Sequence, residues 1–190
     1  MPAPWRSPLS RALHRNRSLP NARYFQLATV RPDGSPANRT VVFRNFRGDT
    51  DDVQIVCDRR SEKPEQIRQA PQGEICWYFP KTREQFRLSG MLTLVAADDS
   101  DPALQQARTA AWQAMSSPGR LLFIWPHPGK PREAASFTDQ PPETAAPVEN
   151  FCLLLLLPDC VDHLELRGDP QNRWRYTHSD GSWDIAEINP

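Results

Sequence analysis

The chain has 190 residues, a length that suits one domain with a sizeable core, so residues 1–190 are expected to fold as a single unit. Lys+Arg and Asp+Glu both total 23, so no net charge draws the whole chain to nucleic acid or to an anionic membrane. A hydrophobic content of 38% and six tryptophans exclude an intrinsically disordered chain in spite of twenty prolines.

The N-terminal segment, residues 1–20, is expected to contain a helix. Trp5, Leu9 and Leu13 recur at helical spacing, and Ser7 is expected to be the N-cap before a proline. The segment lacks the uninterrupted apolar core of a signal peptide, and the most apolar run, residues 151–160, is too short to span a bilayer. We therefore expect a cytoplasmic protein without a membrane partner.

Strands joined by tight turns are expected to dominate the rest of the chain. They are expected at residues 22–30, 39–46, 53–58, 73–79, 85–96, 151–157, 161–168, 173–179 and 182–190. A short helix is expected over 61–71, a longer one over 101–116 with Asp101 as N-cap, and an exposed proline-rich loop over 138–149. This order predicts a mainly β protein with flanking helices, built as a closed or half-closed antiparallel barrel.

The four cysteines, Cys57, Cys76, Cys152 and Cys160, are scattered and form no CxxC pair. They are expected to be reduced, buried small side chains rather than disulfides or metal ligands. Asp, Glu and His show no metal-ligand spacing, so no metal is expected. His127 and His178 are isolated and are interpreted as surface or hydrogen-bonded residues, although His178 could also donate a proton.

Arg39 and Arg44 flank a β-branched apolar run and need a partner if this strand is buried. In a regular strand, positions five apart face opposite sides, so both can serve one ligand only through a bulge or at its two ends. The alternative is an edge strand with solvated arginines.

Two further polar sites interrupt the apolar pattern. Ser61 is expected to cap the helix that begins near Lys63, which would leave backbone N–H groups and a cation together as an anion site; an ordinary capped helix is the alternative. Gln85 and Arg87 face the same side of a strand, where a glutamine amide suits the polar edge of a heteroaromatic ring. The alternative there is the solvent face of a sheet.

The order of these motifs is more specific than any one of them. "RTVVFR", then a strand leading into "SEK" at a helix start, then "QFRLSG" after "WYFP", resembles the pyridoxamine 5'-phosphate oxidase-like family of FMN-binding split barrels. The resemblance covers about residues 22–95, and the opening "WRSPL" suits the oxidase-related, FMN-binding branch of that family. It implies an antiparallel split barrel, FMN as cofactor, and a homodimer with FMN sites at the subunit interface.

The resemblance also implies roles for individual residues. Arg39, Ser61 and Lys63 match positions that hold the FMN phosphate, while Glu62 stands where the family has an arginine. Arg44 replaces a lysine beside the flavin and substrate, and Gln85 matches a glutamine that reaches the flavin of the partner subunit. The complete expected set of cofactor contacts is Arg39, Thr40, Val41, Val42, Arg44, Cys57, Asp58, Ser61, Lys63, Gln85 and Arg87.

The substrate side departs from the vitamin B6 oxidase pattern. The counterpart of its "RLH" element is Arg173-Trp174-Arg175, with no histidine, and its substrate-phosphate residues have no counterpart near Arg120 and Trp125. Arg120, Trp125, Arg173 and Arg175 are the expected substrate region, no catalytic residue is assigned, and oxidation of pyridoxamine phosphate is expected to be weak or absent.

Three functional hypotheses follow. The first is an FMN-dependent oxidoreductase acting on a small molecule, and the second is a flavin-storing or flavin-sensing protein without turnover. The third is a β-barrel that binds nucleic acid through arginines and aromatic residues, which the zero net charge disfavours. For the homodimer, an apolar sheet face carrying Trp77, Phe79 and Phe86 is expected to need a second copy to cover it.

Overall fold

The computed structural model describes residues 2–132 and 134–190. Its helices are α1 (Arg6–Asn16), α2 (Lys63–Gln69), α3 (Pro102–Gln113) and α4 (Ser117–Leu121), with a 3-10 turn over Ala134–Ser136. Its strands are β1 (Tyr24–Val30), β2 (Pro36–Val42), β3 (Asn45–Phe46), β4 (Val53–Asp58), β5 (Gln72–Phe79), β6 (Glu84–Val95), β7 (Phe151–Glu165), β8 (Asn172–Ser179) and β9 (Ser182–Glu187).

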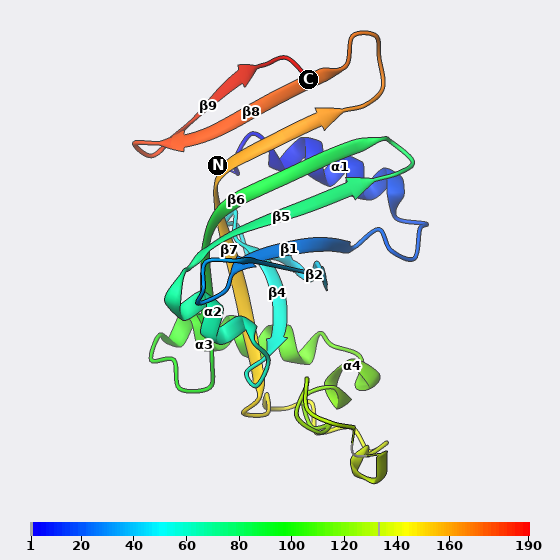
Figure 1. Ribbon diagram of the computed structural model, residues 1–190, viewed down its shortest axis with the longest axis vertical. Helices are drawn as coiled ribbons and strands as arrows, with labels where there is room; N and C mark the ends of the chain where they lie inside the picture. The colour runs from blue at the N-terminus through cyan, green and yellow to red at the C-terminus, as the bar shows by residue number, and fades with distance from the viewer. Residues whose placement is uncertain (1, 133) are drawn as a thin grey trace.

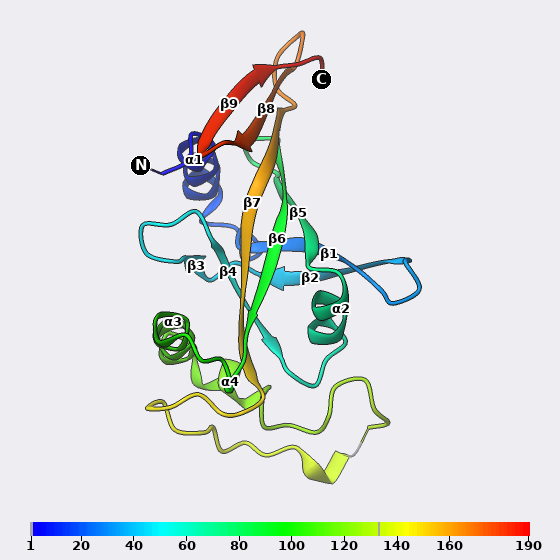
Figure 2. The same ribbon diagram turned by 90° about the vertical axis from the view of Figure 1, so that its left-hand side faces the viewer.

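The strands form one antiparallel sheet in the order β2-β1-β5-β6-β7-β4-β3, and β8 pairs with β7 and then with β9. The long strand β7 pairs with β4 along its first half and with β8 along its second half. In the two views, β6 and β7 run the length of the molecule, with β8 and β9 at one end and α3 and α4 at the other (Figures 1 and 2). Within the described residues no ladder joins β2 to β4, so the curled sheet stays open there. The prediction of an antiparallel split barrel with flanking helices is confirmed.

Strand β7 is continuous, whereas one strand had been expected before Pro158 and a separate one after it. Pro158 pairs opposite Gly90, where the register with β6 shifts in a bulge. A bulge tolerates the missing N–H of proline. A Cβ at Gly90 would lie 2.0 Å from the Leu157 carbonyl oxygen, so only glycine permits this close approach.

The barrel core contains the aromatic side chains of Trp77, Phe79 and Phe86, which are 1%, 0% and 0% exposed within one chain. Trp5 and Leu9 of α1 belong to the same core cluster. Helix α1 packs across the strands and covers the apolar face, so the expectation that a second copy must cover it is wrong. A separate cluster under α3 contains Trp112, Phe123 and Phe151, among others.

The helix ends agree with the sequence in one case and not in another. Asp101 caps α3 as predicted, accepting hydrogen bonds from the N–H groups of Ala103 and Leu104 at 2.8 and 3.3 Å. Ser7 does not cap α1, because the helix begins at Arg6 and the Ser7 hydroxyl instead accepts a bond from Arg11.

Residues 138–149 contain neither helix nor strand, and most of them are exposed. No helix within residues 2–132 and 134–190 combines the length and apolar character needed to cross a membrane.

Candidate functional site

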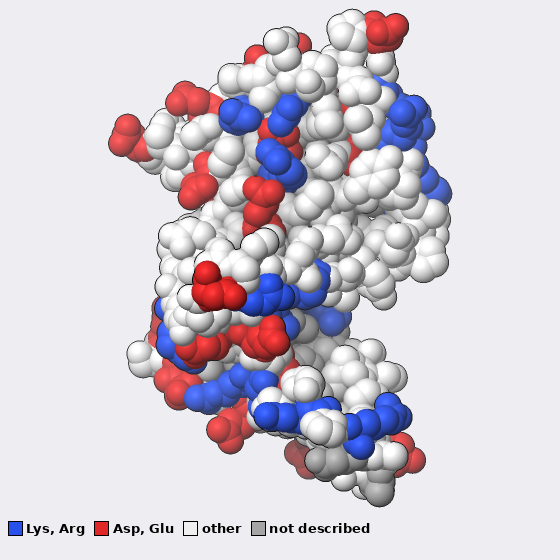
Figure 3. Space-filling model, in the orientation of Figure 1, with Lys and Arg blue, Asp and Glu red and all other residues white. Residues whose placement is uncertain are grey.

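A pocket of about 570 Å³ opens where the sheet is split. Its near wall consists of residues from β2, from the end of β4 and from the start of α2; its far wall is the segment that follows α3. The molecule is hollowed between its main body and the lobe carrying α4, with Lys and Arg on both sides (Figure 3). The near wall contains Arg39, Thr40, Val41, Val42, Arg44, Val56, Cys57, Asp58, Ser61 and Lys63. These include every expected cofactor contact except Gln85 and Arg87.

Arg39 is held in place by neutral groups. It donates from Nη1 to Thr29 Oγ1 at 2.5 Å and from Nη2 to Gln66 Oε1 at 2.9 Å, and Thr29 itself donates to Gln66 at 2.6 Å. Burial lowers the pKa of Arg39, although arginine remains charged at any ordinary pH. The guanidinium therefore brings a fixed positive charge to the pocket that no carboxylate hydrogen-bonds within the described residues.

Arg44 lines the same pocket because the strand does not continue past it. A single strand over 39–46 was expected, but β2 ends at Val42 and β3 begins at Asn45. At the break, Phe43 N–H donates to Arg23 and Arg44 N–H donates to Gln54. The interruption removes the strict alternation that would have put the two arginines on opposite faces. Arg44 Nε is buried and has no hydrogen-bond partner among the described residues.

Ser61 and Lys63 both lie in the pocket wall, but Ser61 is not the helix cap that was expected. Its hydroxyl donates to the Asp58 carbonyl at 2.8 Å and so closes the turn after β4. The N-cap of α2 is Glu62, which makes no side-chain capping bond. Lys63 is the first residue of α2, so it directly follows the turn that Ser61 closes.

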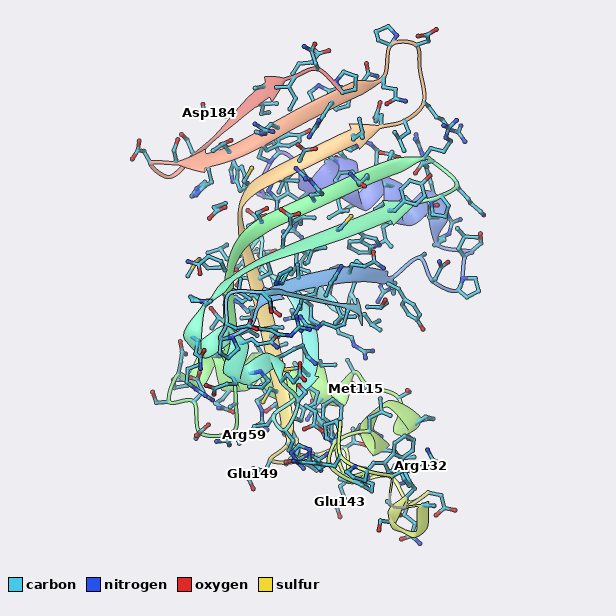
Figure 4. The ribbon with its side chains drawn as sticks, viewed as in Figure 1. Arg59, Met115, Arg132, Glu143, Glu149 and Asp184 are labelled. Carbon is cyan, nitrogen blue, oxygen red and sulfur yellow. The ribbon has the colours of Figure 1, made fainter. Side chains whose placement is uncertain are left out.

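The far wall is aromatic and basic. Trp125 and Phe137 meet edge-on at 5.4 Å, and the Arg132 guanidinium lies 5.0 Å from the Phe137 ring centre. Lys130 adds positive charge to the same wall, and His127 adds an imidazole ring. Met115 lies close to the sheet and Arg132 farther out in the lobe (Figure 4). From the sequence only Trp125 was expected here, because a Pro- and Gly-rich loop has no periodicity to show which side chains face inward.

Arg60 connects the two walls. It binds the Asp58 carboxylate at 2.7 and 3.0 Å and donates to the carbonyl oxygens of Trp125 at 2.9 Å and Phe123 at 3.4 Å. Asn150 donates to the same Phe123 oxygen at 3.0 Å. The end of β4 and the far wall are thus joined through one guanidinium. Arg60 lies just before the "SEK" motif and was not among the expected site residues.

The remaining expected residues lie outside the pocket of a single chain. Arg87, Arg173 and Arg175 surround the nearly buried carboxylate of Asp162 at 3.6, 2.9 and 3.7 Å. They lie on β6 and β8, toward the end of the molecule where Asp184 is labelled in Figure 4. Gln85 is near Cys76, whose sulfur is 3.8 Å from Gln85 Oε1.

Arg120 also lies outside the pocket. It is 6% exposed and donates to the Met115 carbonyl at 2.6 Å and to Ser117 Oγ at 3.2 Å. These bonds stabilise the turn between α3 and α4. Within one chain, the Arg120 side chain therefore has a structural role. Of the four residues expected at the substrate region, Trp125 alone lines the pocket of one chain.

One cluster of possible metal ligands was not anticipated. Glu84, His163 and Glu165 place ligand atoms within 4.8 Å of one another. Glu84 and Glu165 are directly paired across β6 and β7, far apart in the sequence, so spacing could not reveal them. His163 Nε2 lies 3.0 Å from Glu84 Oε2, and its ring stacks on Phe86 at 4.0 Å. The hydrogen bond between His163 and Glu84 accounts for their closeness: the two form a buried histidine–carboxylate pair.

Comparison with protein families gives one match over half of the chain. Residues 2–96 match the family model described as "Pyridoxamine 5'-phosphate oxidase, FMN-binding domain". A curated relative, pyridoxine/pyridoxamine 5'-phosphate oxidase 2 of Arabidopsis thaliana, is 38% identical over 194 residues, covering 99% of this chain and 98% of the relative. Pyridoxine/pyridoxamine 5'-phosphate oxidase of Thermobifida fusca is 27% identical and covers 91% of this chain and 80% of the relative.

Solved structures show the same fold. A pyridoxamine 5'-phosphate oxidase-related, FMN-binding protein from Nostoc punctiforme is 59% identical, with a TM-score of 0.96 over 99% of this chain and 98% of that one. PhzG from Burkholderia lata, in complex with tetrahydrophenazine-1-carboxylic acid, has a TM-score of 0.78 over 97% of this chain and 91% of that one. At 16% identity, the PhzG likeness concerns the fold alone.

Proposed function

The chain belongs to the pyridoxamine 5'-phosphate oxidase family of FMN-binding oxidoreductases, and from that premise we propose that the pocket at the split of the sheet binds FMN. The observation that carries the proposal is the pair Arg39 and Arg44, which line one pocket from either side of a strand break. An arginine held by neutral acceptors and a second arginine with a buried, unpartnered Nε suit a ligand that carries negative charge.

The charge of the pocket supports a phosphate ligand. Its lining contains five Lys and Arg side chains against one carboxylate, Asp58, which is already paired with Arg60. A phosphate monoester carries close to two negative charges near neutral pH, and charge-assisted hydrogen bonds are about twice as strong as neutral ones. We propose that Arg39, Ser61 and Lys63 hold the phosphate and that Arg44 lies nearer the ring.

The apolar part of the lining supports the flavin ring. Val41 and Val42 line the near wall, and Val56 packs against the apolar cluster that contains Met115 and Phe123, which line the same pocket. FMN supplies the two-electron redox chemistry when it is bound, while this chain's residues bind it, orient it and exclude water. Arg60 links the two walls, so it supports the same site without lining it.

We further propose that the protein is a homodimer in which each FMN site receives residues from both chains. Gln85 and Arg87 lie outside the pocket of their own chain, as do Arg173 and Arg175. Arg87, Arg173 and Arg175 outnumber the one carboxylate, Asp162, that they surround, which favours an anionic partner near these guanidinium groups. An isologous twofold interface could bring this face of one chain to the pocket of the other.

A flavin titration of the apo-protein tests the FMN site. We expect saturable FMN binding with quenching of flavin fluorescence, and weaker binding of riboflavin, which lacks the phosphate, by about ten- to hundredfold. Equal affinity for the two ligands would contradict a phosphate site at Arg39. Anaerobic addition of candidate substrates to the yellow holoprotein then separates an oxidoreductase, whose flavin absorbance bleaches, from a flavin-storing protein, whose absorbance does not change.

A further inference from the structure

Two cysteines face each other where the sheet meets the pocket: Cys57 lines the pocket and Cys152 lies behind it. Cys57 on β4 and Cys152 on β7 are directly paired in antiparallel register, so their side chains lie on the same face of the sheet. Two residues further along the same register, Arg59 N–H donates to the Asn150 carbonyl at 2.8 Å. Hydrogen-bonded pairs recur at every second residue of an antiparallel ladder, so Cys57 and Cys152 form such a pair, with Cα atoms about 5.5 Å apart. Disulfides most often join Cα atoms roughly 5.5–6 Å apart.

The two thiols differ in access and in charge. Cys57 lines the pocket, whereas Cys152 lies behind it with 0% exposure. A hydrogen bond from the Cys57 thiol lowers the pKa of Cys152, and Arg108 and Arg59 lower it further. The same bond, together with burial, raises the pKa of Cys57. The pair thus combines a pocket-lining cysteine that is only 4% exposed with a fully buried neighbour whose sulfur favours the thiolate form, the nucleophile in disulfide formation.

We propose that Cys57 and Cys152 form an oxidisable dithiol, which a peroxide closes to a disulfide when the pocket is empty and which bound flavin shields. The shielding rests on the proposed FMN site, whereas disulfide formation rests only on the position of the two thiols.

The chemistry balances with one peroxide per disulfide. Cys57 reacts through its thiolate, which its raised pKa keeps scarce, so this step is slow. The thiolate sulfur attacks hydrogen peroxide and breaks its O–O bond, giving a sulfenic acid, and the departing hydroxide takes up the proton that Cys57 lost and becomes water. The Cys152 sulfur then attacks the Cys57 sulfur; an S–S bond forms, and the sulfenic hydroxyl leaves as a second water with the Cys152 proton. Two thiols are oxidised, and one peroxide is reduced to two waters.

The other cysteines provide matched controls. Cys76 on β5 and Cys160 on β7 are both half-buried, and β6 lies between their strands. They can therefore bridge neither to each other nor to the Cys57–Cys152 pair without moving a strand.

Intact mass spectrometry of the apo-protein after treatment with hydrogen peroxide tests the chemical step. We expect the loss of two hydrogens and, after digestion without reductant, a peptide link between Cys57 and Cys152. Cys76→Ser and Cys160→Ser should still form this link, whereas Cys152→Ser should leave a sulfenic acid at Cys57 that dimedone traps. A wild-type apo-protein that gains only oxygen, or that links other cysteines, would overturn the proposal even if the variants failed to fold.

The same treatment with FMN present tests the shielding. With flavin binding verified from its absorbance after gel filtration, we expect the disulfide to form at least about tenfold more slowly than in the apo-protein, since the ligand would fill the pocket that Cys57 lines. An unchanged rate in fully loaded protein would overturn the shielding. If no FMN binds, the proposed cofactor site fails, while the disulfide measured in the apo-protein stands as its own result.

Discussion

Arg60 grips Asp58 through two parallel bonds, from Nε to Oδ1 at 3.0 Å and from Nη2 to Oδ2 at 2.7 Å, while the same guanidinium donates to main-chain oxygens of the opposite wall. The bond to Asp58 raises the pKa of Arg60, so the guanidinium of Arg60 remains charged at any ordinary pH. This side chain thereby ties the near wall, which carries Arg39, to the far wall, which carries Trp125.

We expect Arg60→Ala to weaken FMN binding about ten- to hundredfold and to lower the melting temperature, because Asp58 loses its charged partner and the far wall loses two donors. Flavin titration and thermal unfolding measure the two effects. Arg59→Ala is the matched control: its contacts to Asp98 and Glu149 are exposed, and such pairs contribute at most about 1 kcal/mol. If Arg59→Ala and Arg60→Ala change FMN affinity and melting temperature equally, Arg60 does not hold the two walls together.

Arg39→Ala should reduce FMN affinity more than Lys63→Ala. Arg39 offers a planar fork oriented by Thr29 and Gln66, whereas Lys63 is a point charge on a flexible stem at the start of α2. We expect a loss of about 1.5–3 kcal/mol at Arg39, some ten- to hundredfold in affinity, with incomplete recovery in Arg39→Lys. Equal or reversed losses in an FMN titration would argue against Arg39 as the phosphate ligand.

Subunit mixing tests whether two chains share one site. An Arg39→Ala chain and a chain with Gln85→Ala and Arg87→Ala should each bind FMN poorly. After subunit exchange, half of the sites in a heterodimer regain all their contacts, so bound flavin should partly return. Exchange is verified with a tagged chain. An FMN-loaded monomer in sedimentation, or no recovery despite exchange, would show that one chain holds the whole site.

Turnover of pyridoxine or pyridoxamine 5'-phosphate is expected to be weak or absent. The reason is the absence of a histidine at Arg173-Trp174-Arg175, where the oxidase pattern has one. The Arabidopsis relative is named for that activity, and similarity to it would favour turnover of these substrates. A direct assay therefore decides between turnover and weak or absent activity. Oxygen consumption by the FMN-loaded protein at about one turnover per second or faster, within the usual enzyme range, would sink our view.

Glu84 should make stability depend on acid pH. Burial alone would raise its pKa, but hydrogen bonds from His163 and Thr82 lower it below the ordinary value of 4.5 on balance. A depressed folded-state pKa stabilises the protein above the unfolded value, and this contribution is lost as pH falls through the folded pKa. The free energy of unfolding should therefore drop below about pH 4.5, and less steeply in Glu84→Gln. Glu187→Gln, which removes an exposed carboxylate, should leave the slope nearly unchanged.

The sequence alone predicted most of the helices and strands and the residues that form the near wall of the pocket. Alternating apolar residues in β4, β5 and β6 and the Asp101 cap are local signals, because strand faces and helix ends depend on neighbouring residues. The order of "RTVVFR", "SEK" and "QFRLSG" identified the family and the residues of β2, β4 and α2 that line the pocket.

Only the tertiary structure decided how distant segments meet. The break at Phe43 turns Arg39 and Arg44 toward one pocket, and Arg60 reaches the carbonyls of Phe123 and Trp125 from more than sixty residues away. The coverage of Trp77 by α1, the pairing of Cys57 with Cys152 and the cluster at Glu84 likewise depend on contacts between remote parts of the chain. Periodicity and spacing describe neighbours along the chain, whereas these contacts arise from strand register and from packing that buries apolar surface, which no local pattern encodes.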